Sequence, residues 1–242
     1  MRSNLTGATD SSQIGAGMND SYTGEVRVGG PADVRELPGL TIRKLAVSEM
    51  ANNAYLITDS GTGPGTGQAL LIDAAAEPGA LLDLIDAADL RTVVTTHGHW
   101  DHHRALPQVV RATGAETVAH PADAADLPVP VTRPVEHGDT VAVGDQVLEV
   151  VHLRGHTPGS IALVWRGTEG AGTHVFTGDS LFPGGVGNTQ QDPARFTSLL
   201  DDVEARLFGA LPDETWVYPG HGADTTLGAE RPHLAEWRER GW

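Results

Sequence analysis

The chain of 242 residues contains no cysteine. Disulfide bonds and thiolate metal ligands are therefore excluded, and any metal site has to be built from imidazole and carboxylate groups. The sequence also lacks an apolar run approaching the roughly 20 residues that a membrane-spanning helix needs. No leucine-rich stretch of the kind that a secretory signal requires follows the first residues, and we therefore expect a cytoplasmic protein.

Basic residues are scarce as well. The 16 Lys and Arg residues are outnumbered by 32 Asp and Glu residues, which gives a formal net charge of −16 at pH 7. Such a field repels phosphate backbones, and metal cations would offset part of it locally. We expect a small-molecule substrate and neither a nucleic acid nor a membrane as partner, while the composition leaves the oligomeric state open.

The first 20 residues are polar, rich in Gly and Ser, and without helical or strand periodicity. This composition predicts a disordered N-terminal tail. The remaining residues, 21–242, are numerous enough for one large domain with a buried core. We therefore predict a short tail followed by a single domain.

Strand and helix patterns alternate through this domain. In the first half, helical spacing predicts a helix around 81–88, and apolar runs predict strands at 41–48, 53–58, 69–73 and 91–96. The second half repeats this plan, with strands predicted at 140–143, 147–153, 161–165, 174–177 and 215–218. Asp192-Pro193 is a good helix start, and the last predicted helix spans 228–240. The alternation predicts a layered α/β fold.

A dense group of candidate metal ligands follows the strand at 91–96. In the segment THGHWDH (96–102), His97 and His99 can project to the same side of an extended backbone, while Asp101 and His102 begin the next turn. Four potential ligands therefore converge within six residues.

Three further candidates each stand just beyond a predicted strand, next to glycine. They are His156 in GHTPGS, Asp179 in TGDS and His221 in PGHG. Loops at the strand ends of an α/β sheet gather along one edge, where binding sites are usually built. A single loop histidine is often an ordinary polar residue, but seven residues in this arrangement favour a metal site.

Seven ligands are too many for one tetrahedral zinc ion, but they divide well between two ions if one carboxylate bridges them. The first ion is assigned to His97, His99 and His156. The second is assigned to Asp101, His102 and His221, with Asp179 as the bridge. A hydroxide between the ions would be the nucleophile, and Asp101 and Asp179 are the candidate catalytic carboxylates. Two zinc ions suit these ligands, and iron or manganese would also fit.

This pattern resembles the metallo-β-lactamase superfamily, whose signature is His-x-His-x-Asp-His followed by a distant His, Asp and His. The match extends over about residues 40–230. The resemblance implies an α/β fold of the αββα four-layer type, with the metal ions at one edge. The segments TGDSLF and PGHG look most like the glyoxalase II group, which hydrolyses hydroxyacyl thioesters of glutathione. By the same resemblance, Asp73 would be a carboxylate that steers a ligand histidine.

Two features differ from that group. The chain ends 21 residues after His221 (242 − 221), which is too short for the helical substrate domain of full-length glyoxalase II, so it looks like a compact branch. Asn188 stands where the family usually has Lys or Arg for the carboxylate of a thiol conjugate. We therefore expect Asn188 to line the substrate groove and the carrier to be a thiol other than glutathione. Asn188 could instead only satisfy backbone groups in a glycine-rich turn.

The leading functional hypothesis is a dinuclear metal-dependent hydrolase of a hydroxyacyl thioester. A thiolate leaves with little help from an acid, and the pattern offers no obvious general acid apart from the ligands. A lactonase of the same fold is an alternative. A second alternative is a persulfide dioxygenase, which resembles this group but binds one iron through two His and one Asp. A non-catalytic metal-binding protein is disfavoured, because no ligand position is lost.

The remaining histidines have simpler interpretations. His152 and His174 share strand faces with apolar residues and are expected to be structural. His103 is a candidate neighbour of the metal ligands, whereas His120 has no obvious converging partner.

Overall fold

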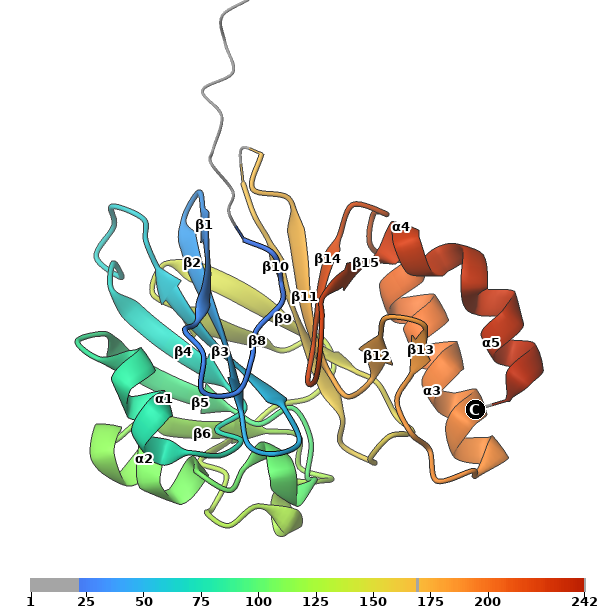
Figure 1. The fold of residues 1–242 in the computed structure, drawn as a ribbon, viewed down its shortest axis with the longest axis horizontal. Helices are drawn as coiled ribbons and strands as arrows, with labels where there is room; N and C mark the ends of the chain where they lie inside the picture. The colour runs from blue at the N-terminus through green and yellow to red at the C-terminus, as the bar shows by residue number, and fades with distance from the viewer. Residues whose placement is uncertain (1–21, 169, 242) are drawn as a thin grey trace, which may run out of the picture.

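Two β-sheets face each other in the computed structural model, which describes residues 22–168 and 170–241 (Figure 1). Within these residues the first sheet has seven strands, in the order β1 to β7. They span Asp33–Leu37, Leu40–Val47, Asn52–Asp59, Gln68–Ile72, Asp89–Val94, Glu116–Ala119 and Arg133–Pro134.

The second sheet has six strands among the described residues, in the order β15-β14-β11-β10-β9-β8. In chain order, β8 to β11 span Thr140–Val143, Gln146–His152, Ile161–Arg166 and Thr173–Gly178. β14 and β15 span Trp216–Pro219 and Thr225–Thr226. A separate hairpin pairs β12 (Leu181–Phe182) with β13 (Gly185–Val186).

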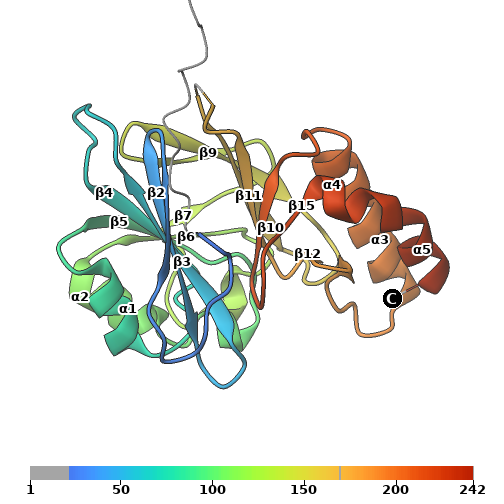
Figure 2. The ribbon, with the colours of Figure 1, turned by 45° about the horizontal axis from the view of Figure 1, so that its top comes forward.

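Helices cover the outer face of each sheet, as both views show (Figures 1 and 2). α1 (Pro78–Ile85) and α2 (Leu106–Thr113) lie on the first sheet. α3 (Pro193–Val203), α4 (Leu227–Glu230) and α5 (Leu234–Arg240) lie on the second. One apolar core fills the space between the sheets, and one lies under each helix layer. The layers therefore follow the order αββα, as the resemblance implied.

β4 shows why the sequence folds this way. Its residues Leu70 and Ile72 belong to the core between the sheets, while Leu71 packs beneath the helices of the first layer. Successive residues of a strand point to opposite faces, so a strand covered on both faces needs a continuous apolar run. Burying each such side chain contributes about 1.5–3 kcal/mol.

Each strand predicted from the sequence is present, with its bounds displaced by at most two residues. The predicted start of α3 is also confirmed: the Asp192 carboxylate accepts hydrogen bonds from the backbone N–H groups of Ala194 and Arg195, at 2.8 and 3.2 Å. The predicted helix at 228–240 is divided into α4, a 3₁₀ turn at Arg231–His233, and α5. Pro232 explains the division, because proline lacks the N–H that a continuous α-helix uses.

The predicted tail at residues 1–20 lies outside the described residues. Tyr22, the first described residue, is packed: its ring is buried, and its hydroxyl donates to Asp224 at 2.6 Å. No helix in the described part of the chain is long and apolar enough to cross a membrane.

The loops that carry the candidate ligands leave the sheets at one edge. β4 and β5 are parallel neighbours, so Asp73 and the 96–102 loop follow adjacent strand ends. β11 and β14 are also parallel, and they bring Asp179 and His221 together. The two sheets meet here, since Ile161 N donates to Thr96 O at 2.9 Å.

Candidate metal centre

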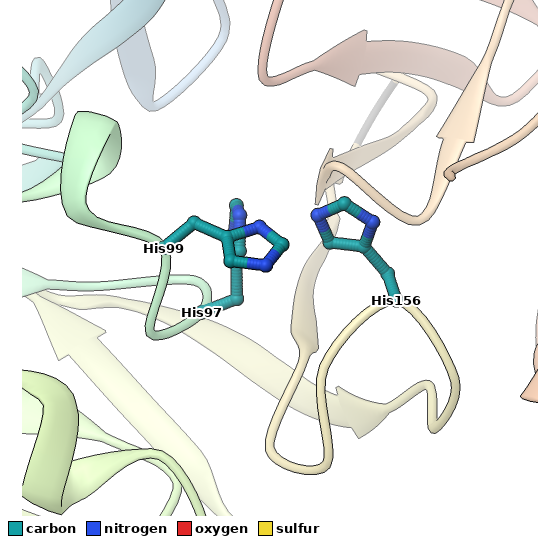
Figure 3. Close-up of side chains that lie close together, drawn as sticks. All are labelled: His97, His99 and His156. Carbon is teal, nitrogen blue, oxygen red and sulfur yellow. The ribbon is translucent and has the colours of Figure 1, made fainter. Parts of the chain in front are cut away.

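Three histidines from two loops form the first group of candidate ligands (Figure 3). His97 and His99 belong to the loop after β5, and His156 belongs to the loop between β9 and β10. One nitrogen of each ring lies within 4.8 Å of the other two. His97 and His156 are buried and His99 is half-buried, so the group is open to solvent on one side.

A second group lies beside the first and contains Asp101, His102 and His221. The two imidazole Nε2 atoms are 3.1 Å apart. Asp101 Oδ2 lies 3.4 Å from His102 Nε2 and 3.5 Å from His221 Nε2. The rings of His97 and His102, at 4.2 Å between centroids, connect the two groups.

Asp179 stands between the groups. Its Oδ1 lies 3.4 Å from His102 Nε2, and its Oδ2 lies 3.5 Å from His221 Nε2 and 3.7 Å from His156 Nε2. One carboxylate is therefore in contact with ligands of both groups, which is the position that a bridging acid requires.

Hydrogen bonds at Nδ1 turn Nε2 toward the centre in four of these histidines. The partners of Nδ1 are Thr96 Oγ1 for His97 (3.0 Å), Asp73 Oδ2 for His102 (2.9 Å), Asn188 O for His156 (2.8 Å) and Met50 O for His221 (3.0 Å). A metal-binding histidine characteristically uses its other ring nitrogen in this way, which fixes the orientation of the ring.

Three buried polar atoms at the centre lack a hydrogen-bond partner within the described residues: His97 Nε2, His156 Nε2 and Asp179 Oδ1. An unsatisfied buried polar atom costs roughly 1–3 kcal/mol, which a bound cation would remove. The donors are imidazole nitrogens and carboxylate oxygens, a set that suits zinc, iron or manganese. The residues present therefore fit a metal site.

The protonation states of the ligands differ between the two groups. Burial, together with the charge of His102, holds the pKa of His97 well below its usual value, and burial lowers the pKa of His156 to about 4. In the second group, the neighbouring carboxylates of Asp179 and Asp73 outweigh burial and raise the pKa of His102 to about 10. The pKa of Asp101 is lowered, because its bonds to His221 and Asn52 and the charge of His102 outweigh burial.

Asp73 supports the second group through hydrogen bonds to Thr96 and His102. Its Oδ1 accepts from Thr96 N at 2.8 Å, and its Oδ2 accepts from Thr96 Oγ1 at 2.8 Å as well as contacting His102. The carboxylate therefore connects the start of the 96–102 loop to a ligand ring, which is the placement expected for Asp73 from the sequence.

Asn52 and His103 complete the surroundings. Asn52, at the start of β3, donates to Asp101 Oδ2 at 2.8 Å and accepts from Ser48 Oγ at 2.6 Å. Sequence reasoning missed Asn52; the available signal was a pair of asparagines at the head of an apolar strand. His103 Nε2 lies 3.2 Å from Gly98 O, which makes it a neighbour of the ligand loop, as expected.

The loop that carries His221 is held by a buried lysine. Lys44 is the only lysine of the chain and is 0% exposed. Its ammonium group donates to Gly24 O, Gly222 O and Asp224 Oδ1, at 2.6, 2.7 and 2.6 Å. Burial outweighs the nearby carboxylate and lowers the pKa of Lys44. No sequence pattern had singled this residue out.

A pocket of about 770 Å³ lies against the loop that follows Asp179 in the chain, and Asn188 O, which His156 contacts, connects its wall to the first ligand group. The loop Phe182–Thr189 forms most of its wall, and Gln191, Arg240 and Gly241 complete it. Asn188 lines this pocket. Its side-chain oxygen accepts from Gln190 N at 2.7 Å, so it also satisfies the backbone of its own turn. Arg240 places a cation in the same pocket, although Asn188 itself carries no charge.

The other histidines lie away from the ligands. His174 is buried and bonds through its two nitrogens to Tyr218 Oη and Ala171 O, at 2.9 and 2.8 Å, in agreement with a structural role. His152 bonds to Pro158 O at 2.8 Å. His120 does have a partner, contrary to the sequence reading: its ring stacks on that of His152, with centroids 4.0 Å apart.

The sequence of the chain is similar to that of known proteins. The sequence matches the metallo-beta-lactamase superfamily over residues 47–221. A hydroxyacylglutathione hydrolase of Anaeromyxobacter dehalogenans is 38% identical over 159 residues, which cover 64% of this chain and 57% of that relative. The chain therefore spans little more than half of that relative's length.

Two solved structures share the fold at higher coverage. ETHE1 from Myxococcus xanthus is 33% identical, with a TM-score of 0.70 and coverage of 82% of this chain and 84% of that one. A protein solved in a di-iron-bound form is also 33% identical, with a TM-score of 0.62 and coverage of 78% and 96%. The matched range contains the seven candidate ligands at its centre and end, and the chain thus belongs to the metallo-beta-lactamase superfamily.

Proposed function

We propose that the chain is a dinuclear metal-dependent hydrolase of thioesters. The observation that carries the proposal is the position of Asp179, whose carboxylate lies within 3.7 Å of His156 and within 3.5 Å of His102 and His221. His97, His99 and His156 would hold one ion and Asp101, His102 and His221 the other, with Asp179 shared. Divalent cations bound there would activate a water molecule and polarise the carbonyl of the substrate.

The chain's own residues prepare this site. Burial keeps His97 and His156 neutral near pH 7, and their surroundings keep Asp101 and Asp179 ionised. These are the protonation states in which the side chains bind a cation. His102 and His221 are the exceptions, since the pKa of each is raised and metal binding there has to compete with a proton.

Two considerations support a thioester as the substrate: the chemistry of its leaving group and the name of the 38% identical relative. A thiolate departs with little protonation, which suits a centre whose titratable groups are committed to ligation. The 38% identical relative is named a hydroxyacylglutathione hydrolase. We infer an anionic carrier thiol, because Arg240, which also contacts Gly184 O and Glu236, lines the pocket against the loop after Asp179 in a chain whose formal net charge is −16. Glutathione and coenzyme A conjugates both meet this description.

A panel of thioesters tests the proposal. Metal-free protein would be reconstituted with two equivalents of zinc, iron or manganese and assayed with lactoyl-glutathione, an acyl-coenzyme A and an uncharged alkyl thioester. Hydrolysis that needs both equivalents, with the anionic substrates preferred, is the expected result. Protein that binds two ions and hydrolyses none of the thioesters would contradict it, and lactones assayed in parallel would show whether the lactonase alternative holds.

Persulfide dioxygenation is the second candidate function. Iron is present in one of the 33% identical structures, which supports iron as a metal for this fold, although that structure holds two iron ions and this alternative needs one. Oxygen consumption with a persulfide and a single iron ion per chain would support it, whereas hydrolysis that depends on two ions without oxygen uptake would exclude it.

A further inference from the structure

Asp123 is a buried carboxylate outside the seven candidate ligands. It is 1% exposed and stands at the start of a 3₁₀ turn, Ala124–Asp126, in the segment after β6. Its own backbone N–H donates to His120 O at 3.1 Å, which fixes the turn. The sequence pattern had not identified it, because a single acid in a loop carries no signal.

The side chain of Asp123 joins the two loops that carry the first ligand group. Its Oδ2 accepts from Gly98 N at 2.8 Å and from Thr157 Oγ1 at 2.5 Å, and its Oδ1 accepts from Gly159 N at 2.7 Å. Gly98 lies between His97 and His99, and Thr157 directly follows His156. The carboxylate therefore bonds to the immediate chain neighbours of all three ligands.

The glycine that follows Pro158 is what allows Asp123 to approach. A Cβ atom at position 159 would lie 2.7 Å from Asp123 Cγ and 2.8 Å from Asp123 N, and one at position 98 would lie 3.2 Å from Asp123 Cβ. The first distance is far inside van der Waals contact, so Gly159 has to lack a side chain. The glycine in PGS thus serves this contact, whereas a Cβ atom at position 98 would first meet Asp126 Cβ and Oδ2, both at 3.1 Å.

We propose that Asp123 is a positioning residue that sets the distance between the His97–His99 loop and the His156 loop, and thereby the affinity of the first metal ion. The inference rests on the proposed pair of ions. An ionised carboxylate can accept all three hydrogen bonds, whereas an amide in its place has one oxygen and would point an N–H group at a donor. Replacing it should let the two loops separate.

Asp123→Asn is the first test, with metal content and chelator competition as readouts. Loss of groups that orient ligands typically weakens metal binding by about 10- to 100-fold. We expect this loss for one of the two ions, so that dialysed protein retains about one ion per chain instead of two. Asp83→Asn is the control, because Asp83 is an exposed acid of α1, and this variant should retain both ions.

Single-site backgrounds assign the effect to one ion. His221→Ala leaves the first group intact, and Asp123→Asn in that background should weaken binding of the remaining ion by the same factor. In the His156→Ala background, which leaves the second group, Asp123→Asn should change the affinity by less than about twofold. Equal losses in both backgrounds would overturn the proposal, because they would show a general structural effect.

A milder variant covers the case in which Asp123→Asn fails to fold. Thr157→Val removes one of the three hydrogen bonds to Asp123, while Thr157→Ser keeps the hydroxyl and should restore binding. If wild-type protein binds two ions and both Asp123→Asn and Thr157→Val retain them with unchanged affinity, the inference is wrong. If wild-type protein binds fewer than two ions, the proposed function fails instead.

Discussion

The two ligand groups are supported in different ways. The second group rests on residues of the first sheet and the strand ends, with Asn52 and Asp73 in contact with its ligands. The first group is held by contacts between loops: Asp123 bonds to both ligand loops, and Arg195 of α3 donates to His156 O. A sheet fixes its residues through many backbone hydrogen bonds, whereas loops open at lower free energy. We infer that the second half of the centre is built to be rigid and the first half to be adjustable.

Removing the residue shared by the two halves should have the largest effect. Asp179→Ala is expected to abolish hydrolysis and to release at least one ion, because two neighbouring cations would lack a common anion. Metal analysis and turnover measured on folded protein check this. Asp201→Ala, at an exposed acid of α3, provides a control that should retain activity. Full activity with both ions bound in Asp179→Ala would remove this residue from its proposed position.

A substitution of Lys44 tests the second half of the centre, which contains His221, by its effect on the free energy of unfolding. Lys44→Met would leave Asp224 buried without its cation and the carbonyl groups of Gly24 and Gly222 without their donor. Removing one partner of a buried ion pair lowers the free energy of unfolding by about 3–5 kcal/mol. Denaturant titration of metal-free protein measures this.

The double variant Lys44→Met with Asp224→Asn sharpens the result. The buried charge is then absent on both sides, and the loss should be smaller than for Lys44→Met alone. An additive or larger loss would show that the ion pair is not the source of the effect.

Asp73→Asn tests the same half through metal affinity. Asp73 has a φ of +58°, a conformation that asparagine also tolerates, so the backbone should be kept. The amide would nevertheless weaken the bond that orients His102, and the affinity for the second ion should fall by about 10- to 100-fold. Chelator competition should show the larger loss for the second ion, the reverse of the order expected for Asp123→Asn. A smaller loss is expected for the first ion, because Asp73 also bonds to Thr96, whose hydroxyl contacts His97. If both variants lose the same ion, the division into two halves has no basis.

The smallest expected effect lies in the pocket. Arg240→Gln removes the cation, and a partly shielded ion pair is worth on the order of 1 kcal/mol, which corresponds to about fivefold in kcat/KM. The change should appear mainly in KM, and only for anionic thioesters, because the contact is remote from the reacting carbonyl. Asn188→Lys should act in the opposite direction. An uncharged thioester is the control, and an equal loss on this substrate would assign Arg240 a structural role.

Much of the fold and the ligand pattern could be predicted from the sequence. Apolar periodicity located the strands, and the glycine-flanked histidines and acids stood out because they follow strands directly. Asn52, Lys44 and Asp123 could not be found in the same way. Each acts through a partner far along the chain, such as Asp101, Gly222 or Thr157, and a separation of this kind leaves no local period.

The sequence did not predict the shortest strands, for a related reason. β7 has two residues, and β12 and β13 have two each, so pairing with a neighbour rather than their own composition makes them strands. Arg240 gives the same lesson for the pocket. From the sequence of its own loop, Asn188 predicted a pocket wall without charge. The cation in the pocket is Arg240, which belongs to α5, more than 50 residues further along the chain.

The burial of Lys44 gives this protein a chemical reporter of its own. Because the chain has one lysine and that side chain is 0% exposed, an amine-reactive reagent can reach an ε-amine only when the packing of Gly24, Gly222 and Asp224 around Lys44 opens. The rate at which this single side chain is acylated therefore measures how often that part of the centre opens, without any engineered label. Bound metal ions should slow the acylation, since they would hold His221 and its loop in the closed arrangement.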